Sequence, residues 1–435
     1  MNPVSPASPA YQQTLDYIFN RLPMFSSVGG SAIKKGHDNI LELCRLLGNP
    51  HQQFKSIHIG GTNGKGSTSH MLAAVFQQAG YTTGLYTSPH LSDFRERIKI
   101  NGQMVPETWV IDFVEKLKPE IERIQPSFFE ITVAMAFAWF AEQKVDIAMI
   151  EVGMGGRLDS TNIIDPILSI ITNISYDHTQ FLGDTLALIA EEKAGIIKPG
   201  VQAIIGESHP ETERIFFLNA LKKGVTPIYA ESVWDVVLTH KNPFHQFLKV
   251  VDNTNHTLHE LELDLTGKYQ LKNVRNVLTA YLLLKDEWGL HWNHVTDALK
   301  HVKKLTGLQG RWDVLQQHPL TVLDVAHNVA GIQMVLEQLK ETTYQHLHIV
   351  LGMVKDKDIN TVLAMLPKEA TYYFTKAQIP RALPEAELQI QASTHELQGH
   401  SFPTVAEAFA NARTKAQPDD MVLVCGSCFV VAEVV

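Results

Sequence analysis

Cysteine, basic runs and long apolar segments are scarce in this sequence, and each scarcity excludes a class of protein. Only three cysteines occur among 435 residues, which is too few for the disulfide framework of a small secreted domain. No stretch approaches the roughly 20 apolar residues of a membrane span, and the first residues lack the basic and apolar regions of a signal peptide. We therefore expect a cytoplasmic protein without a membrane partner.

Basic residues are also fewer than acidic residues. The chain has 37 Lys and Arg against 46 Asp and Glu, giving a formal net charge of −9. A nucleic-acid-binding protein usually carries a clustered basic patch, and no run of basic residues stands out here. We expect small-molecule substrates, no nucleic-acid partner, and a monomer.

The order of apolar patterns predicts an α/β protein. With 45% hydrophobic and 19% charged residues, the chain is long enough for two or three domains. Helical periodicity runs from Tyr11 to Leu22 and from Asp38 to Leu47, with a mobile-looking connection between them, and buried strands then alternate with helices. We predict a P-loop domain with a mostly parallel sheet over residues 1–302, with a small antiparallel excursion within 202–265. A linker, 303–309, and a smaller doubly wound, Rossmann-like domain, 310–435, would follow.

A glycine-rich loop lies between a half-buried strand ending near Ile59 and a helix predicted from Ser67 to Ala79. Its sequence, G-G-T-N-G-K-G, permits positive φ and close backbone approach. Backbone N–H groups and the helix N-terminus can therefore converge on a polyphosphate, with Lys65 adding a charge. The spacing departs from the standard P-loop because Gly66 separates Lys65 from Ser67. A plain surface turn is the alternative, but turns rarely join a buried strand to a buried helix.

Polar side chains follow several other predicted strands. Ser88 follows the strand T-T-G-L-Y-T, Glu151 ends the apolar strand V-D-I-A-M-I-E, and His178 comes after the buried strand 167–174. Ligands of parallel sheets bind beyond the carboxyl ends of strands, so these side chains should meet the glycine-rich loop at one rim. Oxygen donors with a single imidazole suit magnesium better than zinc.

The loop G-T-N-G-K-G-S resembles the P-loop variant of the amide-forming ligases that extend folates and cell-wall peptides. The motifs T-S-P-H-L, F-F-E, E-V-G-M-G-G-R-L-D and E-K-A-G-I-I narrow the resemblance to the folylpolyglutamate synthases, which in bacteria are often also dihydrofolate synthases. The resemblance covers nearly the whole chain, with motifs from Gly61 to Asp324. It implies ATP and two magnesium ions as cofactors.

The resemblance also implies where the cofactors bind. One magnesium ion is assigned to Ser88 and Glu151, and a second to His178 and Lys193, with the lysine carrying a carbamate. Taken alone, a lysine beside two glutamates is most often part of a surface ion pair, and a lone histidine is usually structural or solvated. The implied catalytic groups are Lys65, His178 and Lys193. The implied nucleotide contacts are Thr62, Asn63, Gly64, Lys65, Gly66, Ser67, Asn273, Arg311 and Asp324.

Two short motifs imply which residues contact the folate substrate. F-F-E implies that Ser127, Phe128, Phe129 and Glu130 contact the pterin, since aromatic faces pack on a flat heterocycle and a carboxylate accepts its N–H groups. A glutamate in the first turn of a helix is also favoured by the helix dipole alone, so a purely structural role stays open. The tripeptide Leu158, Asp159 and Ser160 is implied to contact the folate precursor.

The implied reaction joins L-glutamate to dihydropteroate or to the terminal glutamate of a reduced folate. ATP would convert the acceptor carboxylate to an acyl phosphate, which the amine then attacks, with Arg311 and Asp324 reaching over from the second domain. A cell-wall peptide ligase is the nearest alternative, but those enzymes place a nucleotide-sugar domain before the P-loop, where only about 60 residues stand here. An ATP-gated binding module is the non-enzymatic alternative, and it would leave His178 and Lys193 unexplained.

Overall fold

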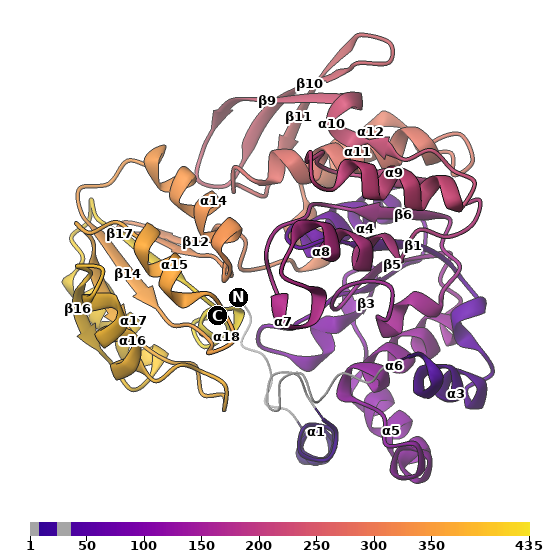
Figure 1. Cartoon of the computed structure of the whole chain (residues 1–435), viewed down its shortest axis with the longest axis horizontal. Coiled ribbons are helices and arrows are strands. Elements are labelled where there is room, and N and C mark those ends of the chain that lie inside the picture. Colours follow the sequence, from indigo (N-terminus) through magenta and orange to yellow (C-terminus); the bar gives the residue numbers. More distant parts are fainter. Residues whose placement is uncertain (1–7, 24–35) are drawn as a thin grey trace.

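The computed structural model describes residues 8–23 and 36–435 (Figure 1). The predicted connection between the first two helices falls largely outside these ranges. Helix α1 (Pro9–Arg21) begins after Ser8, whose hydroxyl accepts a hydrogen bond from the Tyr11 N–H. Helix α3 (Asp38–Leu46) follows, so both helices lie where helical periodicity predicts them.

The main sheet has eight strands in the order β4-β3-β2-β5-β1-β6-β7-β8. All neighbours from β2 to β8 pair in parallel, and β3 and β4 add an antiparallel edge. The prediction of a mostly parallel sheet is therefore confirmed. The strands are β1 (Lys55–Gly60), β2 (Thr83–Tyr86), β3 (Ile98–Ile100), β4 (Gln103–Met104), β5 (Ile147–Glu151), β6 (Leu168–Ile171), β7 (Ala203–Ile205) and β8 (Ile228–Tyr229).

Helices cover both faces of this sheet because alternate strand residues point to opposite sides. Ile147 and Met149 of β5 join the core that contains α4, α11 and α12, while Ala148 and Ile150 join the core that contains α1, α3, α5 and α6. In the described part of the chain, no helix has both the length and the apolar character needed to cross a membrane. The helices are α4 (Lys65–Gln78), α5 (Glu107–Ile124), α6 (Phe128–Glu142), α7 (Thr179–Leu182), α8 (Leu186–Ala194), α9 (Glu213–Lys222), α10 (Ala230–Val233), α11 (Gln270–Leu284) and α12 (Trp292–Leu299), with short 3₁₀ turns η2 (Pro50–Gln52), η3 (Phe94–Arg97) and η4 (Ser160–Ile163).

A three-stranded antiparallel sheet stands at the top of the view in Figure 1, where residues 202–265 were predicted to form an antiparallel excursion. It consists of β9 (Trp234–Lys241), β10 (Gln246–Asp252) and β11 (Thr257–Leu263) in the order β11-β10-β9. Trp234, Leu248 and Val250 bury this sheet in the same core as α4, α11 and α12. The excursion is therefore packed onto the first domain.

The C-terminal part has its own six-stranded sheet, in the order β12-β13-β17-β14-β15-β16. It is mixed, since β12 runs antiparallel to β13 and the other neighbours are parallel. Ile349 and Val350 of β14 belong to two different cores, so helices cover both faces as predicted. The elements are β12 (Asp313–Gln317), β13 (Leu320–Leu323), α14 (Val329–Lys340), β14 (Leu347–Leu351), α15 (Ile359–Met365), β15 (Thr371–Phe374), α16 (Glu385–Ser393), β16 (Gln398–Ser401), α17 (Val405–Lys415), β17 (Met421–Cys425) and α18 (Cys428–Ala432).

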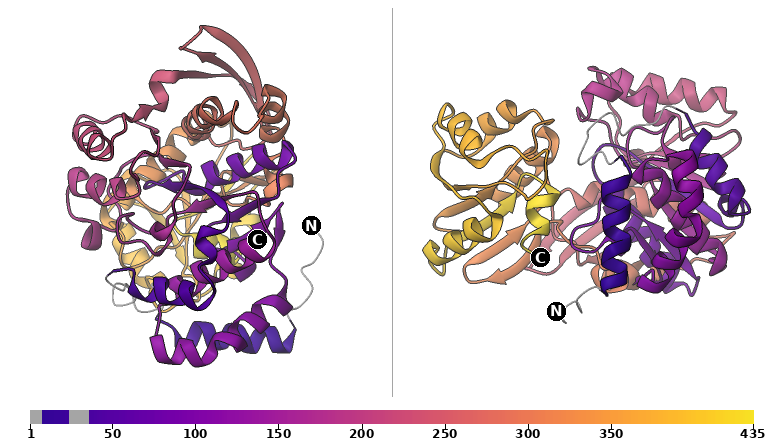
Figure 2. Two further views of the ribbon diagram at one scale, coloured as in Figure 1. Left: turned by 90° about the vertical axis from the view of Figure 1, so that its right-hand side faces the viewer. Right: turned by 90° about the horizontal axis from the view of Figure 1, so that it is seen from below.

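Two lobes lie side by side in Figure 2, and we call the described residues up to 302 the N-terminal lobe and residues 310–435 the C-terminal lobe. The predicted linker, 303–309, is largely helical, because α13 (Val302–Thr306) occupies most of it. Leu308 is buried in the core of the N-terminal lobe, and the Lys99 Nζ donates to the Thr306 carbonyl at 2.8 Å. The connection is thus anchored to one lobe, while the domain boundaries themselves stay predictions.

Candidate active site

A cavity of about 430 Å³ lies beyond the carboxyl ends of β1, β2, β5 and β6, and the C-terminal lobe forms its other wall. The expectation that these strand ends meet at one rim is confirmed by this geometry. Every residue predicted to contact the nucleotide or a metal ion lines the cavity: Thr62, Asn63, Gly64, Lys65, Gly66, Ser67, Ser88, Glu151, His178, Lys193, Asn273, Arg311 and Asp324.

The glycine-rich loop is held in a conformation that needs glycine at two positions. Gly61 has φ +135°, and a Cβ there would lie 1.9 Å from the Thr172 Oγ1. Gly64 has φ +84°, and its Cβ would lie 2.2 Å from the Asn273 Oδ1. Because Gly64 is the N-cap, α4 starts at Lys65 rather than at the predicted Ser67. The first-turn N–H groups, which have no acceptor within the helix, therefore face the loop.

Charges from both lobes converge beside this loop. The Lys65 Nζ donates to the Thr62 carbonyl at 3.0 Å. At Gly66, a Cβ would stand 3.5 Å from the Arg311 Nη2 and 3.8 Å from both carboxylate oxygens of Glu151. A phosphate chain lying on the loop would consequently meet Lys65 and Arg311, with Glu151 close by.

Glu151 and Ser88 form the candidate site for the first metal ion. Glu151 is buried at the end of β5, and its Oε2 accepts a hydrogen bond from the Ser88 N–H at 3.0 Å. Burial raises the pKa of Glu151, while the charge of Lys65 and the Ser88 N–H act in the opposite direction. In the described residues, no three His, Cys, Asp or Glu side chains gather as a metal cluster. One carboxylate and one hydroxyl beside a phosphate site nevertheless fit Mg²⁺, which takes its other ligands from phosphates and water.

Lys193 and His178 were predicted to hold a second ion. The Lys193 Nζ is buried and donates to the Gly61 carbonyl at 2.9 Å. Burial, together with the charge of Lys65, lowers the pKa of Lys193 to about 7. Burial also lowers the pKa of His178 to about 3, which keeps its ring in the neutral form that binds metals. A protonated lysine donates hydrogen bonds and repels a cation, whereas a carbamate would supply anionic oxygen ligands, so this pair fits Mg²⁺ best if Lys193 carries a carbamate.

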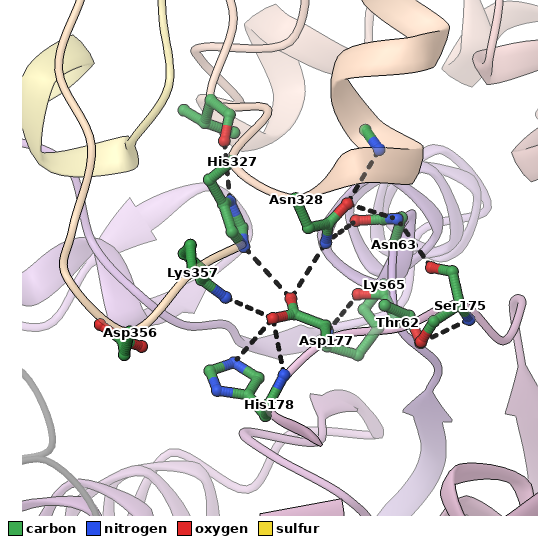
Figure 3. A network of polar contacts seen from close by, with 12 residues as sticks. Thr62, Asn63, Lys65, Ser175, Asp177, His178, His327, Asn328, Asp356 and Lys357 are labelled. Atoms are coloured by element: carbon green, nitrogen blue, oxygen red, sulfur yellow. Dashed lines mark hydrogen bonds and ion pairs between the residues drawn. The ribbon is translucent and has the colours of Figure 1, made fainter. Parts of the chain in front are cut away.

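Asp177 connects the two lobes (Figure 3). Its Oδ1 forms an ion pair with the Lys357 Nζ, and its Oδ2 accepts a hydrogen bond from the Asn328 Nδ2 at 3.0 Å and lies 3.5 Å from the His327 Nε2. Burial alone would raise its pKa, but the hydrogen bond from His327 and the surrounding positive charges hold the pKa of Asp177 well below its usual range. We predicted no role for these four residues. Lys357 lies in the loop after the parallel strand β14, so the strand-end argument places it at that edge of the second sheet but does not show its partner in the other lobe.

Asn273 and Asp324 are both engaged within the protein. The Asn273 Nδ2 donates to the Gln270 Oε1 at 2.8 Å, and the Gln270 Nε2 donates to the Ser67 Oγ at 3.1 Å. Asp324 accepts hydrogen bonds from the Tyr269 hydroxyl at 2.7 Å and from the Trp312 N–H at 2.9 Å. Asn273 is therefore linked through Gln270 to Ser67 at the start of α4, and Asp324 forms a contact between the lobes through Tyr269. Their contacts with a nucleotide stay predictions.

The F-F-E residues lie outside the cavity lining. Ser127 and Glu130 form a capping box, in which the Ser127 Oγ accepts from the Glu130 N–H at 3.2 Å and the Glu130 Oε2 accepts from the Ser127 N–H at 2.7 Å. Phe128 is buried, and Phe129 packs against the cavity wall, since a Cβ at Gly153 would lie 2.3 Å from its ring. For Glu130 the structure shows the helix-end role that the sequence left open.

The L-D-S tripeptide also lies outside the cavity lining. Leu158 is 40% exposed, whereas Asp159 is buried and its Oδ2 accepts a hydrogen bond from the Met154 N–H at 2.8 Å. Burial raises the pKa of Asp159 against the opposing effect of its hydrogen bonds. Asp159 thus fixes the loop after β5. Contacts of Leu158, Asp159 and Ser160 with a folate stay predictions.

Two family models match the chain. Residues 59–284 match the Mur ligase middle domain, and residues 310–428 match the Mur ligase, glutamate ligase domain. The folylpolyglutamate synthase of Lacticaseibacillus casei is 32% identical over 435 residues, which cover 98% of this chain and 97% of that protein. The probable bifunctional folylpolyglutamate synthase/dihydropteroate synthase of Haloferax volcanii is 34% identical over 433 residues, and this chain spans 50% of that protein's length.

Solved structures of similar proteins share the fold of this chain over nearly its whole length. E. coli FolC in complex with DHPP and ADP has a TM-score of 0.85 at 30% identity, covering 98% of this chain and 97% of that one. The bifunctional folylpolyglutamate synthase/dihydrofolate synthase from Yersinia pestis, complexed with AMPPNP and Mn ion, has a TM-score of 0.83 at 27% identity, covering 100% and 98%. The chain therefore belongs to the dihydrofolate synthase/folylpolyglutamate synthase family and is an ATP-dependent glutamate ligase of that type.

Proposed function

We propose that this chain joins L-glutamate to dihydropteroate and to the terminal glutamate of reduced folates, with release of ADP and phosphate. The observation that carries the proposal is the cavity in which the glycine-rich loop and Glu151 of one lobe face Arg311 of the other. Activation of a carboxylate by ATP needs charge screening and exact positioning more than covalent chemistry from the protein. The convergence of these groups supports such a phosphoryl transfer.

The roles of the protein groups follow from their charges. The first-turn N–H groups of α4 and the Lys65 ammonium bind the phosphates, for which Lys65 exchanges the Thr62 carbonyl for a phosphate oxygen. Arg311 screens the negative charge from the C-terminal lobe. The acyl phosphate would then form between the two lobes, whose contact limits the access of water until the glutamate amine attacks.

Magnesium would be held by Ser88 and Glu151, and when bound it would screen the charge on the phosphates. A second ion would need the carbamate on Lys193. A carbamate forms from carbon dioxide and a neutral amine, and the lowered pKa of Lys193 supports that form near neutral pH. His178, as a neutral ring, would be the other ligand.

The pterin would lie near Phe129, which packs on the cavity wall at Gly153, with Leu158 exposed on the same loop. Glu130 would then contribute through the helix end it stabilises. These placements are proposals that a complex with dihydropteroate can test.

The test is a substrate exchange with purified protein. We expect ADP release that depends on L-glutamate together with either dihydropteroate or a reduced folate. Release of ADP only with a cell-wall amino-acid nucleotide would instead identify a peptide ligase. Binding of ATP without turnover on any of these acceptors would favour the ATP-gated module.

A further inference from the structure

Asp177 and Lys357 form a buried ion pair between the lobes. They lie 180 residues apart in the sequence, Asp177 after β6 and Lys357 after β14. Their side chains are 8% and 6% exposed. Since each belongs to a different lobe, this burial exists only while the lobes are together.

The second oxygen of Asp177 is bound from the C-terminal lobe as well. Asn328 donates to it at 3.0 Å and also caps α14, because the Asn328 Oδ1 accepts from the Gly331 N–H at 2.8 Å. His327 approaches the same oxygen at 3.5 Å. A carboxylate with this many partners keeps a fixed position, and so do the two loops of the C-terminal lobe that surround it.

The same network reaches the phosphate loop. Asn328 and Asn63 exchange two amide hydrogen bonds, of 3.1 and 3.3 Å (Figure 3). The Asn63 N–H also donates to the Asn173 Oδ1 at 3.0 Å. Asn63 lies between Thr62 and Gly64 in the glycine-rich loop. The position of the C-terminal lobe in this structure is therefore connected to the loop that would bind the phosphates.

We propose that Asp177 is a positioning residue that holds the two lobes closed over the phosphate loop, with Lys357 as its partner and Asn328 as the link to Asn63. The proposal rests on the proposed function, since closure matters there by bringing Arg311 to the nucleotide. Removing one member of a buried ion pair leaves the other charge buried and unpaired. A single substitution therefore favours the open arrangement, in which the remaining charge returns to water.

This role differs from a contribution to folding. Each lobe has its own sheet and cores, so neither lobe needs the ion pair in order to fold. We expect Asp177→Asn and Lys357→Gln each to lower kcat by at least about 10-fold, with the affinity for AMPPNP changed by less than about 3-fold. The kcat of the double variant should be no lower than that of the less active single variant, because both substitutions break the same ion pair. Asp177→Glu, which keeps the carboxylate, should recover part of the loss.

The experiment compares these variants by glutamate-dependent ADP release and by small-angle X-ray scattering with AMPPNP and Mg²⁺. Lys368→Gln is the matched control, since it removes an exposed ion pair with Glu396 in the same lobe. We expect a larger radius of gyration for both single variants and an unchanged value for the control.

Three results would overturn the proposal. The first is a kcat of the double variant that shows the summed losses of the two single variants, and the second is a radius of gyration of the single variants equal to that of the unmodified chain. The third is a fall in kcat that is explained entirely by a fall in melting temperature. If the unmodified chain releases no glutamate-dependent ADP, the proposed function fails. The scattering comparison then still decides whether Asp177 holds the lobes together.

Discussion

Gly64 of the phosphate loop shows how a single missing side chain permits function. Gly64 combines a positive φ with close contact to Asn273, whereas Gly80, at φ +92°, has nothing within 4 Å of a Cβ. The sequence shows a glycine at each position, but only the structure distinguishes the open space at Gly80 from the crowded space at Gly64.

We predict that Gly64→Ala lowers the affinity for AMPPNP by at least about 10-fold, because the new methyl group adds a clash to the roughly 1 kcal/mol of backbone strain. Gly80→Ala is the control, since it adds the strain alone and should cost only about 1 kcal/mol of unfolding free energy. Titration calorimetry measures the affinity. Equal affinities in the two variants would show that the crowding at Gly64 is unimportant.

Glu151→Gln tests the proposed metal site. Glutamine keeps an oxygen for the Ser88 N–H but removes the charge that would hold Mg²⁺. We expect glutamate-dependent ADP release to fall by at least about 100-fold, while circular dichroism and the melting temperature show a folded protein. Unchanged turnover would remove Glu151 from the site.

At the scale of elements, sequence patterns predict positions better than roles. The apolar runs that end in Glu151 and precede His178 place both residues on the cavity, because strand ends in a parallel sheet share an edge. The role of Ser127 and Glu130 was not decided by sequence, since a capping box and a pterin contact need the same residue types.

Ser127→Ala separates these two roles. Loss of the N-cap should lower the free energy of unfolding by about 1 kcal/mol. Thr404→Ala is the matched control, because Thr404 caps α17 by the same bond to a Glu407 N–H, in the other lobe. If Ser127 only caps α6, turnover per folded molecule stays unchanged in both variants, and a loss confined to Ser127→Ala would instead support contact with the substrate.

For the whole molecule, the contacts between the lobes could not be predicted. Residues such as Asp177, Asn328 and Lys357 lie in loops without periodicity, and their partners are far away in the sequence. Local patterns cannot show which loop of one lobe faces which loop of the other. The predicted linker, 303–309, stays a prediction, but its helix α13 could not be read from local periodicity, since α13 is short and is stabilised by packing on the N-terminal lobe.

Buried histidines make the stability of the molecule depend on pH. Burial, with a smaller effect from Lys198, lowers the pKa of His58 from 6.5 to about 3. The unfolded chain therefore takes up a proton first, and the free energy of unfolding falls from about pH 6.5 down to about pH 3, by at most about 1.4 kcal/mol per pH unit. Urea unfolding of His58→Gln between about pH 7 and about pH 4 should show a shallower decline, and an equal slope would contradict this assignment.

The central claim is that one ATP binds at the glycine-rich loop and that the C-terminal lobe closes over it. A crystal structure with AMPPNP and Mg²⁺ tests it most directly. We predict the triphosphate on residues 61–67, with its terminal phosphate near Glu151 and Arg311. A nucleotide bound elsewhere, or a terminal phosphate far from both side chains, would contradict the account.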